Sequence, residues 1–151
     1  MAQVNGISNE YLGPRSRGHL VTVTDSAAND SNKTLTVTTG KVWEVAYINA
    51  TLVTTATVGN RQIQMIVKDP DAVEIYRMNA VDVQAASTTN YYHFSPRIAA
   101  AAETVATFHT IPILTVLLLP GSTIRIYDSA AVAAAADDMT IAGLVLEYEG
   151  V

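Results

Sequence analysis

The sequence contains no cysteine and few charged residues. Without cysteine, the 151-residue chain can form neither disulfides nor thiolate metal sites, as suits a protein made in a reducing compartment. Charged residues make up 15% of the chain and hydrophobic residues 49%, so we expect a folded domain rather than a disordered chain. So few charges leave much alanine, threonine and aliphatic surface, which favours burial of that surface in an assembly.

Nucleic-acid and membrane partners lack their usual signals. The nine basic residues are scattered along the chain and the net charge is −5, which argues against a nucleic-acid footprint. The first residues contain no basic segment followed by an apolar core, so no secretory signal is predicted. The most apolar run, Ile111 to Pro120, is too short to cross a bilayer and contains Pro112. We therefore expect a soluble protein with no nucleic-acid partner and no membrane partner.

The residue spacings of common catalytic and metal sites are missing as well. No G-x-S-x-G motif and no cysteine offers a nucleophile. The histidines His19, His93 and His109 are isolated and do not form a zinc motif. We interpret them as surface residues or hydrogen-bonded core residues. The sequence thus predicts no enzymatic activity, no cofactor and no metal.

Three aspartates at the two ends of one loop are the best candidates for a cation site. Asp128, Asp137 and Asp138 offer hard oxygen ligands, although their spacing follows no known calcium loop. In the structural alternative, which we favour, Asp128 and Ser129 cap a helical turn while Asp137 and Asp138 solvate its exit. The sequence leaves both interpretations open.

From Leu20 onward, apolar and polar residues alternate with the period of a β-strand. Turn signals separate the alternating segments, among them Asp69-Pro70-Asp71, which closes a hairpin over residues 61–77. The one stretch with helical character is 98–108, which is rich in alanine. Strands are predicted at 19–25, 33–39, 42–57, 61–67, 73–77, 81–85, 90–94, 113–119, 123–127 and 139–148.

This spacing of short strands predicts an all-β fold, in which residues 20–151 form a jelly-roll-like antiparallel β-sandwich. The longest predicted strand, 42–57, is apolar on both faces, as expected of a central strand covered by the core on one face and by a partner on the other. Strict alternation assigns Trp43, Val45 and Tyr47 to one face and Val42, Ala46, Ile48 and Leu52 to the other.

Residues 1–19 differ from the rest of the chain. They are dense in Asn, Gly, Ser and Pro, show no apolar period, and carry a charge of +1 from two arginines and one glutamate. We interpret this segment as an extended N-terminal arm that precedes the sandwich. The alternative is a frayed terminus without a role.

Three segments together resemble small virion proteins of tailed bacteriophages. They are VGNRQIQM at 58–65, LLPGSTIRIYD at 118–128, and the alanine-rich loop that closes on DDMT at 137–140. The resemblance covers about residues 40–150 and is greatest to β-sandwich decoration (cement) proteins of the capsid. It lies in a pattern of strands and turns and transfers no catalytic residue.

The resemblance implies a structural protein of the virion, assembled in the bacterial host cytoplasm. Such a module is often a homotrimer that binds the major capsid protein on the outside of the head and reinforces it. Head-fibre, neck and tail-associated proteins have similar sandwiches, so those positions stay open. For contacts with capsid protein or a neighbouring subunit, the candidate residues are Val4, Ile7, Tyr11, Leu12, Arg15 and Arg17 in the arm and Ala130, Val132 and Ala133 in the alanine-rich loop.

An alternative function of another class is carbohydrate or receptor binding. Trp43 and the aromatic residues of Tyr91–Phe94 are the candidate sugar-stacking residues. Neighbouring strand residues point to opposite faces, so packing in the core or at an interface is the favoured use. An exposed aromatic shelf with Asn or Asp nearby would support sugar binding, whereas buried aromatics would oppose it.

Overall fold

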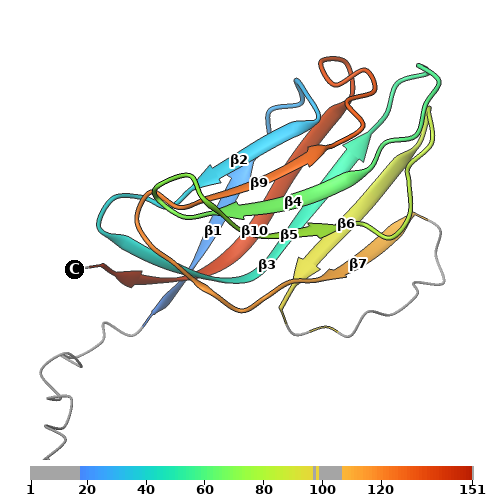
Figure 1. Ribbon diagram of the computed structural model, residues 1–151. Helices are drawn as coiled ribbons and strands as arrows, with labels where there is room; N and C mark the ends of the chain where they lie inside the picture. The colour runs from blue at the N-terminus through green and yellow to red at the C-terminus, as the bar shows by residue number, and fades with distance from the viewer. Residues whose placement is uncertain (1–17, 97, 99–106, 151) are drawn as a thin grey trace, which may run out of the picture.

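The computed structural model describes residues 18–96, 98 and 107–150. Ten strands form two sheets that pack face to face (Figure 1). The described residues contain no helix. The strands are β1 His19–Asp25, β2 Asn32–Thr36, β3 Lys41–Val53, β4 Ile63–Lys68, β5 Glu74–Asn79, β6 Thr89–Ser95, β7 Phe108–Pro112, β8 Leu117–Leu118, β9 Thr123–Asp128 and β10 Asp138–Glu149.

The large sheet has the order β1-β10-β3-β6-β7, and β8 pairs with the lower part of β3. The small sheet has the order β2-β9-β4-β5. Neighbouring strands are antiparallel except for β6 and β7, which are parallel. The predicted all-β antiparallel sandwich is thereby confirmed, whereas the finer jelly-roll assignment stays a prediction.

Two strand predictions are wrong. The segment 81–85 forms a single bridge between Gln84 and Arg61 instead of a strand. The Gln84 amide nitrogen donates to the carbonyls of Leu52 (2.9 Å) and Thr88 (3.1 Å), and its oxygen accepts from the Tyr92 hydroxyl (2.9 Å). Burial raises the pKa of this tyrosine, so the hydroxyl stays protonated as a donor. The segment is thus held by a buried side chain and not by a ladder.

The second wrong prediction concerns 113–119. The strand lies earlier, in β7, and after Pro112 the chain crosses to β9 with only the two-residue β8 on the way. Ile113 and Leu118 are buried along this crossing, which explains the apolar pattern. Of the helix predicted at 98–108, residues 99–106 lie outside the described residues, and Phe108 begins β7.

The 61–77 hairpin is confirmed, with β4 and β5 paired antiparallel. Its turn follows the predicted chemistry, because an Asp69 carboxylate oxygen accepts from the amides of Asp71 (3.0 Å) and Val73 (2.8 Å). Ala72 takes a positive φ of 64° to complete it.

A β-bulge in β3 corrects the predicted faces of the longest strand. Leu144 pairs with Tyr47 and Val145 pairs with Val45, so Ala46 is the extra residue. Strict alternation would have placed Tyr47 with Trp43, but the bulge turns Tyr47 outward. The buried face of β3 therefore runs through Trp43, Val45, Ile48, Ala50 and Leu52.

The core lies between the sheets and is closely packed with aliphatic side chains. The small sheet contributes Leu35, Ile63, Met65, Val67, Ile124 and Ile126. The large sheet contributes Val23, Tyr92, Phe94, Ile111, Met139, Ile141 and Val145 in addition to the β3 residues. Because these residues fill the interior, all candidate interaction surfaces lie on the outer faces and at the loop ends.

Candidate interaction surfaces

The alanine loop, defined as residues 129–136 between β9 and β10, carries three of the predicted contact residues. Ala130 is exposed, whereas Val132 and Ala133 are half-buried. The Ala133 carbonyl accepts two backbone hydrogen bonds of 2.8 and 2.9 Å, which close a turn. A Cβ atom on Gly59 would come within 2.9 Å of Val132, so a neighbouring loop packs closely against this one. The loop is thus held in place, and Ala130 is the exposed one of its three predicted contact residues.

Asp128 fixes the start of the alanine loop from a buried position. One of its carboxylate oxygens accepts from the amides of Gln62 (2.8 Å) and Ala130 (3.0 Å), and the other accepts from the amide of Val132 (3.1 Å). Asp128 therefore caps the turn as predicted, but the turn is not helical, and the Ser129 hydroxyl donates instead to the Gln62 carbonyl at 3.0 Å.

Asp137 fixes the end of the loop through a buried ion pair with Arg61, and both side chains are 0% exposed. The Arg61 Nε donates to Asp137 Oδ2 at 2.7 Å and its Nη2 donates to Oδ1 at 3.1 Å. Arg61 Nη1 donates to the carbonyls of Thr57 (2.9 Å) and Gly59 (2.7 Å). The expectation that Asp137 solvates the loop exit is wrong, because its carboxylate neutralises a buried guanidinium.

The surroundings of Asp137 lower the pKa of its carboxyl. Burial alone would raise that pKa, but hydrogen bonds from Arg61 and from the Thr55 amide (2.7 Å) and hydroxyl (2.8 Å) outweigh it. The carboxylate is thus ionised at neutral pH, with its oxygens already accepting these donors. This leaves it poorly suited to hold a cation.

Lys33 is a second buried cation at the same end of the sandwich, only 2% exposed. Its Nζ donates to the Ala27 carbonyl (2.6 Å) and to the Asn29 side-chain oxygen (2.7 Å). The carboxylates of Asp25 and Asp30 lie 3.7 and 3.5 Å from the same nitrogen. Lys33 thereby organises the loop between β1 and β2.

Three loops meet at this end of the molecule, at the top of Figure 1: the β1–β2 loop, the β3–β4 loop and the alanine loop. The Ser31 amide donates to the Ala134 carbonyl at 2.9 Å, which joins the β1–β2 loop to the alanine loop. We call the buried side chains that hold this end the loop-end charges. They are Lys33, Arg61, Asp128 and Asp137.

The segments that carry the virion-protein resemblance are brought together here. Strands β4 and β9 pair, Arg61 of the first segment binds Asp137 of the third, and Asp128 of the second accepts from Gln62 of the first. The three segments therefore resemble the virion proteins in residues that hold the fold together.

The described residues contain no group of three His, Asp or Glu side chains that could hold a metal ion. The histidines lie apart and have different partners. His93 Nδ1 lies 2.6 Å from the Asn49 side-chain oxygen, and His109 Nε2 lies 2.9 Å from the Asn90 side-chain nitrogen. His19 lies near Glu147, at 3.6 Å. These are the surface and hydrogen-bonded positions that the sequence predicts.

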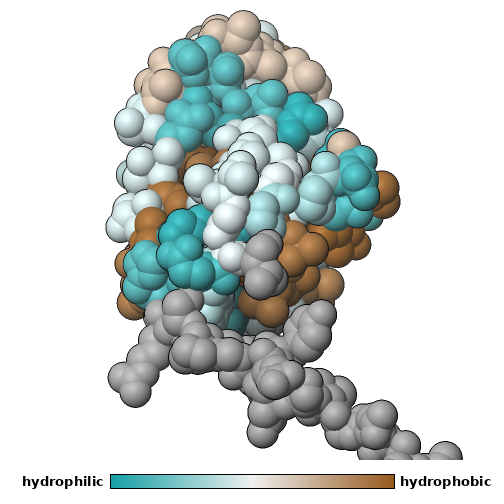
Figure 2. Space-filling model, turned by 90° about the vertical axis from the view of Figure 1, so that its left-hand side faces the viewer, coloured by the Kyte–Doolittle hydropathy of each residue, from teal (hydrophilic) through white to brown (hydrophobic). Residues whose placement is uncertain are grey.

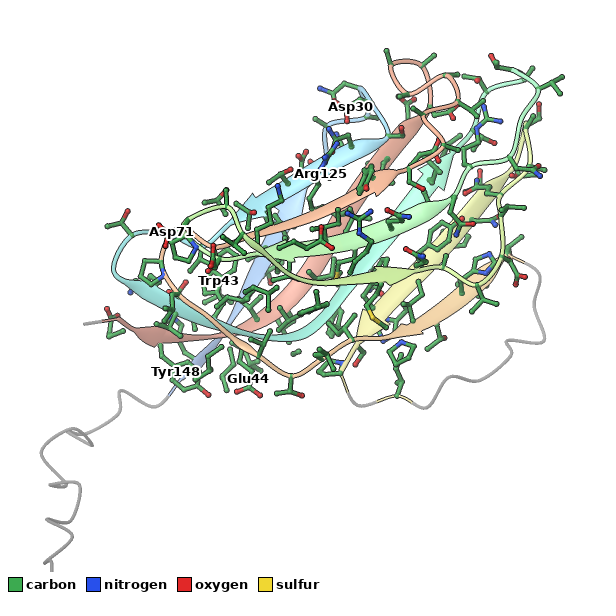
Figure 3. The ribbon with its side chains drawn as sticks, viewed as in Figure 1. Asp30, Trp43, Glu44, Asp71, Arg125 and Tyr148 are labelled. Atoms are coloured by element: carbon green, nitrogen blue, oxygen red, sulfur yellow. The ribbon has the colours of Figure 1, made fainter. Side chains whose placement is uncertain are left out.

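The outer face of the large sheet is almost free of charge. Its charged side chains among the described residues are Glu44 and Asp138, which lie toward opposite ends of the face because Asp138 is opposite Val53. The Tyr148 hydroxyl donates to Glu44 at 3.3 Å, and both of these residues lie at the lower side of the sandwich in Figure 3. Figure 2 shows hydrophobic surface on the flanks of the lower half of the molecule. The face consists of Leu20, Thr22, Thr24, Val42, Glu44, Tyr47, Asn49, Thr51, Val53, Thr89, Tyr91, His93, Phe108, Thr110, Pro112, Leu117, Asp138, Thr140, Ala142, Leu144, Leu146 and Tyr148.

A groove of about 550 Å³ lies on this face, across β3, β6 and β7. The rings of Tyr91 and Phe108 stack on one wall, with centroids 4.7 Å apart, and are 42% and 49% exposed. His93, which stacks on Tyr47, and Asn49 add polar groups. The groove therefore combines an aromatic pair with uncharged hydrogen-bonding groups.

The other aromatic candidates are not available at the surface. Trp43 is 5% exposed, and its Nε1 donates to Glu147 at 2.9 Å. Tyr92 and Phe94 belong to the core. Of the aromatic residues proposed for sugar stacking, Tyr91 is the exposed one, and Phe108 is its partner that the sequence did not indicate.

The outer face of the small sheet is polar and internally paired. Arg125 donates to the Asn32 side chain at 2.7 Å and lies over the Tyr127 ring at 4.2 Å. Gln64 accepts from the Tyr127 hydroxyl (2.8 Å) and from Arg77 (3.1 Å). Lys68 and Glu74 are the other charged residues of this face. A partner would therefore have to desolvate several charges to bind here.

The predicted arm residues Val4, Ile7, Tyr11, Leu12, Arg15 and Arg17 lie outside the described residues. The first described residue is Gly18. Strand β1 begins at His19, which is opposite Glu147 near the end of β10. The alanine loop precedes the other end of β10, so the two predicted contact regions begin at opposite ends of the sandwich, about 30 Å apart at ~3.3 Å per strand residue.

No family model and no curated protein sequence matches the chain. Similar solved structures include PfGH50B, at 11% identity and a TM-score of 0.37 over 87% of this chain and 20% of that chain. A structure of infectious bursal disease virus, Gx strain, is similar at 9% identity and a TM-score of 0.38, over 91% and 38%. Turnip yellow mosaic virus is similar at 9% identity and a TM-score of 0.33, over 91% and 84%.

The chain thus spans a fifth of the first of these structures and 38% of the second. Two of the three are virus structures, but at these scores the likeness is one of β-sheet arrangement alone. The described part of the chain contains no helix with the length and apolarity that a bilayer crossing requires.

Proposed function

We propose that the protein is a structural component of a virion, namely a decoration protein that binds and reinforces the outside of a phage head. The observation that carries this proposal is the outer face of the large sheet, which is broad and holds two charged residues among those described, Glu44 and Asp138. Such a surface suits a protein whose function is to bind another protein and bury this face against it. The resemblance of the segments at 58–65, 118–128 and 137–140 supports the same role.

In this proposal the partner is the major capsid protein, and the protein also associates with itself. The arm, with Arg15 and Arg17, meets capsid carboxylates, and Ala130 of the alanine loop contacts a neighbouring subunit. The resemblance implies three copies. No catalytic step is part of the proposal.

Particle binding tests this function. The full chain should co-purify with intact phage heads at a fixed copy number. Removal of residues 2–17, which stops short of β1, should leave the sandwich folded and sharply reduce occupancy. Equal occupancy with and without these residues would place attachment on the sandwich, and failure of the full chain to bind any head would refute the proposed function.

Carbohydrate binding is the second candidate, because the groove meets the criterion of an exposed aromatic shelf beside an asparagine. Tyr91 and Phe108 could contact the apolar face of a sugar, and Asn49 could bond its hydroxyls. Calorimetric titration with neutral oligosaccharides tests this directly. This function is supported if Phe108→Ala abolishes binding while the unfolding midpoint of that variant stays unchanged, which would show that the core around Phe94 is intact.

A further inference from the structure

We propose that strand β1 is the edge at which copies of this chain join, and that the arm of each copy adds a strand to the β1 edge of the next copy in a ring of three. This inference rests on the proposed function, because it takes the three copies from there and names the contact between them.

The first reason lies in the edges of the two sheets. Four strands of five or more residues form these edges, and three of them carry features that block a further strand. Strand β2 points the charge of Lys33 inward. Strand β5 has a bulge and carries the ion pair of Glu74 with Arg77. Strand β7 is five residues long and ends with Pro112, which has no backbone N–H to donate.

Strand β1, the fourth edge, has none of these features. Its seven residues pair with β10 without a bulge, and their sequence, HLVTVTD, contains no proline and no charged residue between its ends. Four of the seven are valine or threonine, which favour strands. An edge strand leaves about half of its backbone N–H and C=O groups pointing away from the sheet. The β1 edge is therefore open to another strand.

The arm contains a segment that can form this strand. Residues 1–13 include no proline, and Glu10 is their one charged side chain. They exceed the seven residues of β1, which span about 23 Å at ~3.3 Å per residue. In an extended strand Val4 and Ile7 point to opposite faces, so each face of the sheet would gain an apolar side chain.

The direction in which the chain enters β1 favours the edge of a neighbour over its own. A Cβ atom on Gly18 would come within 2.8 Å of Leu146 Cγ and 2.6 Å of Tyr148 Cε1. At Gly18 the chain therefore still runs beside β10 and in line with β1, so it would have to reverse to reach its own edge.

Exchange between copies also accounts for the number three. An arm and an edge are different surfaces, so their contact is heterologous, and a three-fold rotation closes such contacts into a ring. Because arm and edge belong to the same strand, three β1 strands gathered around the axis would bring each arm within reach of the next edge.

Prolines in the arm test the inference without altering the sandwich. Neighbouring residues of a strand point their N–H groups to opposite sides, so one of Ile7→Pro and Ser8→Pro removes a hydrogen bond of the added strand. Ser16→Pro, outside the pairing segment, is the matched control. In sedimentation analysis of the full chain at micromolar concentration, the wild type and Ser16→Pro should be trimers. The more disruptive of the other two variants should associate at least ~10-fold more weakly.

Because the chain has no cysteine, introduced cysteines show whose arm lies on β1. In a mixture of Ile7→Cys protein with Thr22→Cys protein, a flexible bis-maleimide should link the two different chains. Thr36→Cys, at an exposed position on the other sheet, replaces Thr22→Cys in the control mixture and should link far less. A link closed within one chain that carries both Ile7→Cys and Thr22→Cys would place the arm on its own edge and overturn the inference.

Three further results would overturn it: a wild type that is monomeric at micromolar concentration, a wild type that stops at two copies, or a trimer that neither Ile7→Pro nor Ser8→Pro weakens. The particle-binding experiment is separate. A trimer that binds no phage head keeps this inference and loses the proposed function, whereas a monomer that binds heads does the opposite.

Discussion

The loop end of the sandwich and the outer face of its large sheet place charge in opposite ways. At the loop end, four charged side chains are buried: Arg61 pairs with Asp137, Lys33 lies near two carboxylates, and Asp128 accepts from loop amides. On the outer face, where charge costs nothing in water, the sheet presents threonine, alanine, leucine and aromatic rings between two charged residues, Glu44 and Asp138. A monomer that stayed in solution would be expected to show the reverse.

The two regions therefore have different roles. The loop-end charges are used for architecture, because their hydrogen bonds go to loop amides, carbonyls and each other. The outer face of the large sheet, with two charged residues among those described, is exposed for contact with a partner. Substitutions at the two places should therefore differ in what they change: free energy of unfolding in one case, association in the other.

Removal of the Asp137 carboxylate should have the largest effect. Asp137→Ala would leave Arg61 charged and buried without its partner, which costs about 3–5 kcal/mol of the free energy of unfolding. Denaturant unfolding measures this loss. The matched control is Asp138→Ala at the neighbouring, partly exposed position, where we expect less than about 1 kcal/mol. Equal losses in the two variants would show that the ion pair contributes little.

An additional methyl group at Gly143 should have the next largest effect. A Cβ atom there would come within 2.7 Å of the Tyr47 carbonyl oxygen, at the bulge that turns Tyr47 onto the outer face. Because a backbone atom blocks the site, Gly143→Ala should cost about 1–3 kcal/mol. Ala142→Ser, one residue earlier on the exposed side, should stay within about 0.5 kcal/mol. Thermal unfolding of both variants would show whether the bulge tolerates the methyl group.

The sequence predicted the sandwich well where one local signal decides the structure. Alternation located β1 and β9 almost to the residue, and the Asp69-Pro70-Asp71 signal predicted its turn correctly. It failed in β3, because strict alternation cannot reveal that a bulge shifts the phase between Val45 and Tyr47. It also failed at 81–85, where the alternation of Val81 and Val83 is that of exposed loop residues.

The loop-end charges were beyond the reach of local patterns. Arg61 and Asp137 lie 76 positions apart, and nothing near either residue marks it as half of a pair. Charged residues are rarely fully buried, so a sequence reader places them in water. The available hint was that Asp128 and Asp137 flank a loop inside the resembling segments, which identified the place but not the arginine.

Acid should weaken the loop end and leave the outer face unaffected. The pKa of Asp137 is lowered in the folded protein, so its contribution to stability is complete above about pH 4, the ordinary pKa of an aspartate, and is lost as the pH falls through the lower folded value. Unfolding midpoints below pH 4 should therefore drop more steeply for the wild type than for Asp137→Asn, which has no carboxyl to protonate. Parallel curves would mean that other carboxylates cause the acid response.

Neutralising Glu44 should have the smallest effect on stability and is the sharpest probe of the outer face of the large sheet. Its carboxylate accepts one long hydrogen bond, from Tyr148 at 3.3 Å, so Glu44→Gln should change the free energy of unfolding by less than about 0.5 kcal/mol. If a partner covers this face, loss of one of its two carboxylates removes a desolvation cost, and binding to phage heads should stay equal or strengthen, up to about tenfold. The matched variant Arg125→Gln on the small sheet should leave this binding unchanged. Co-sedimentation of both variants with phage heads measures the effect. Weaker binding of Glu44→Gln alone would mean that the glutamate meets a cation of the partner.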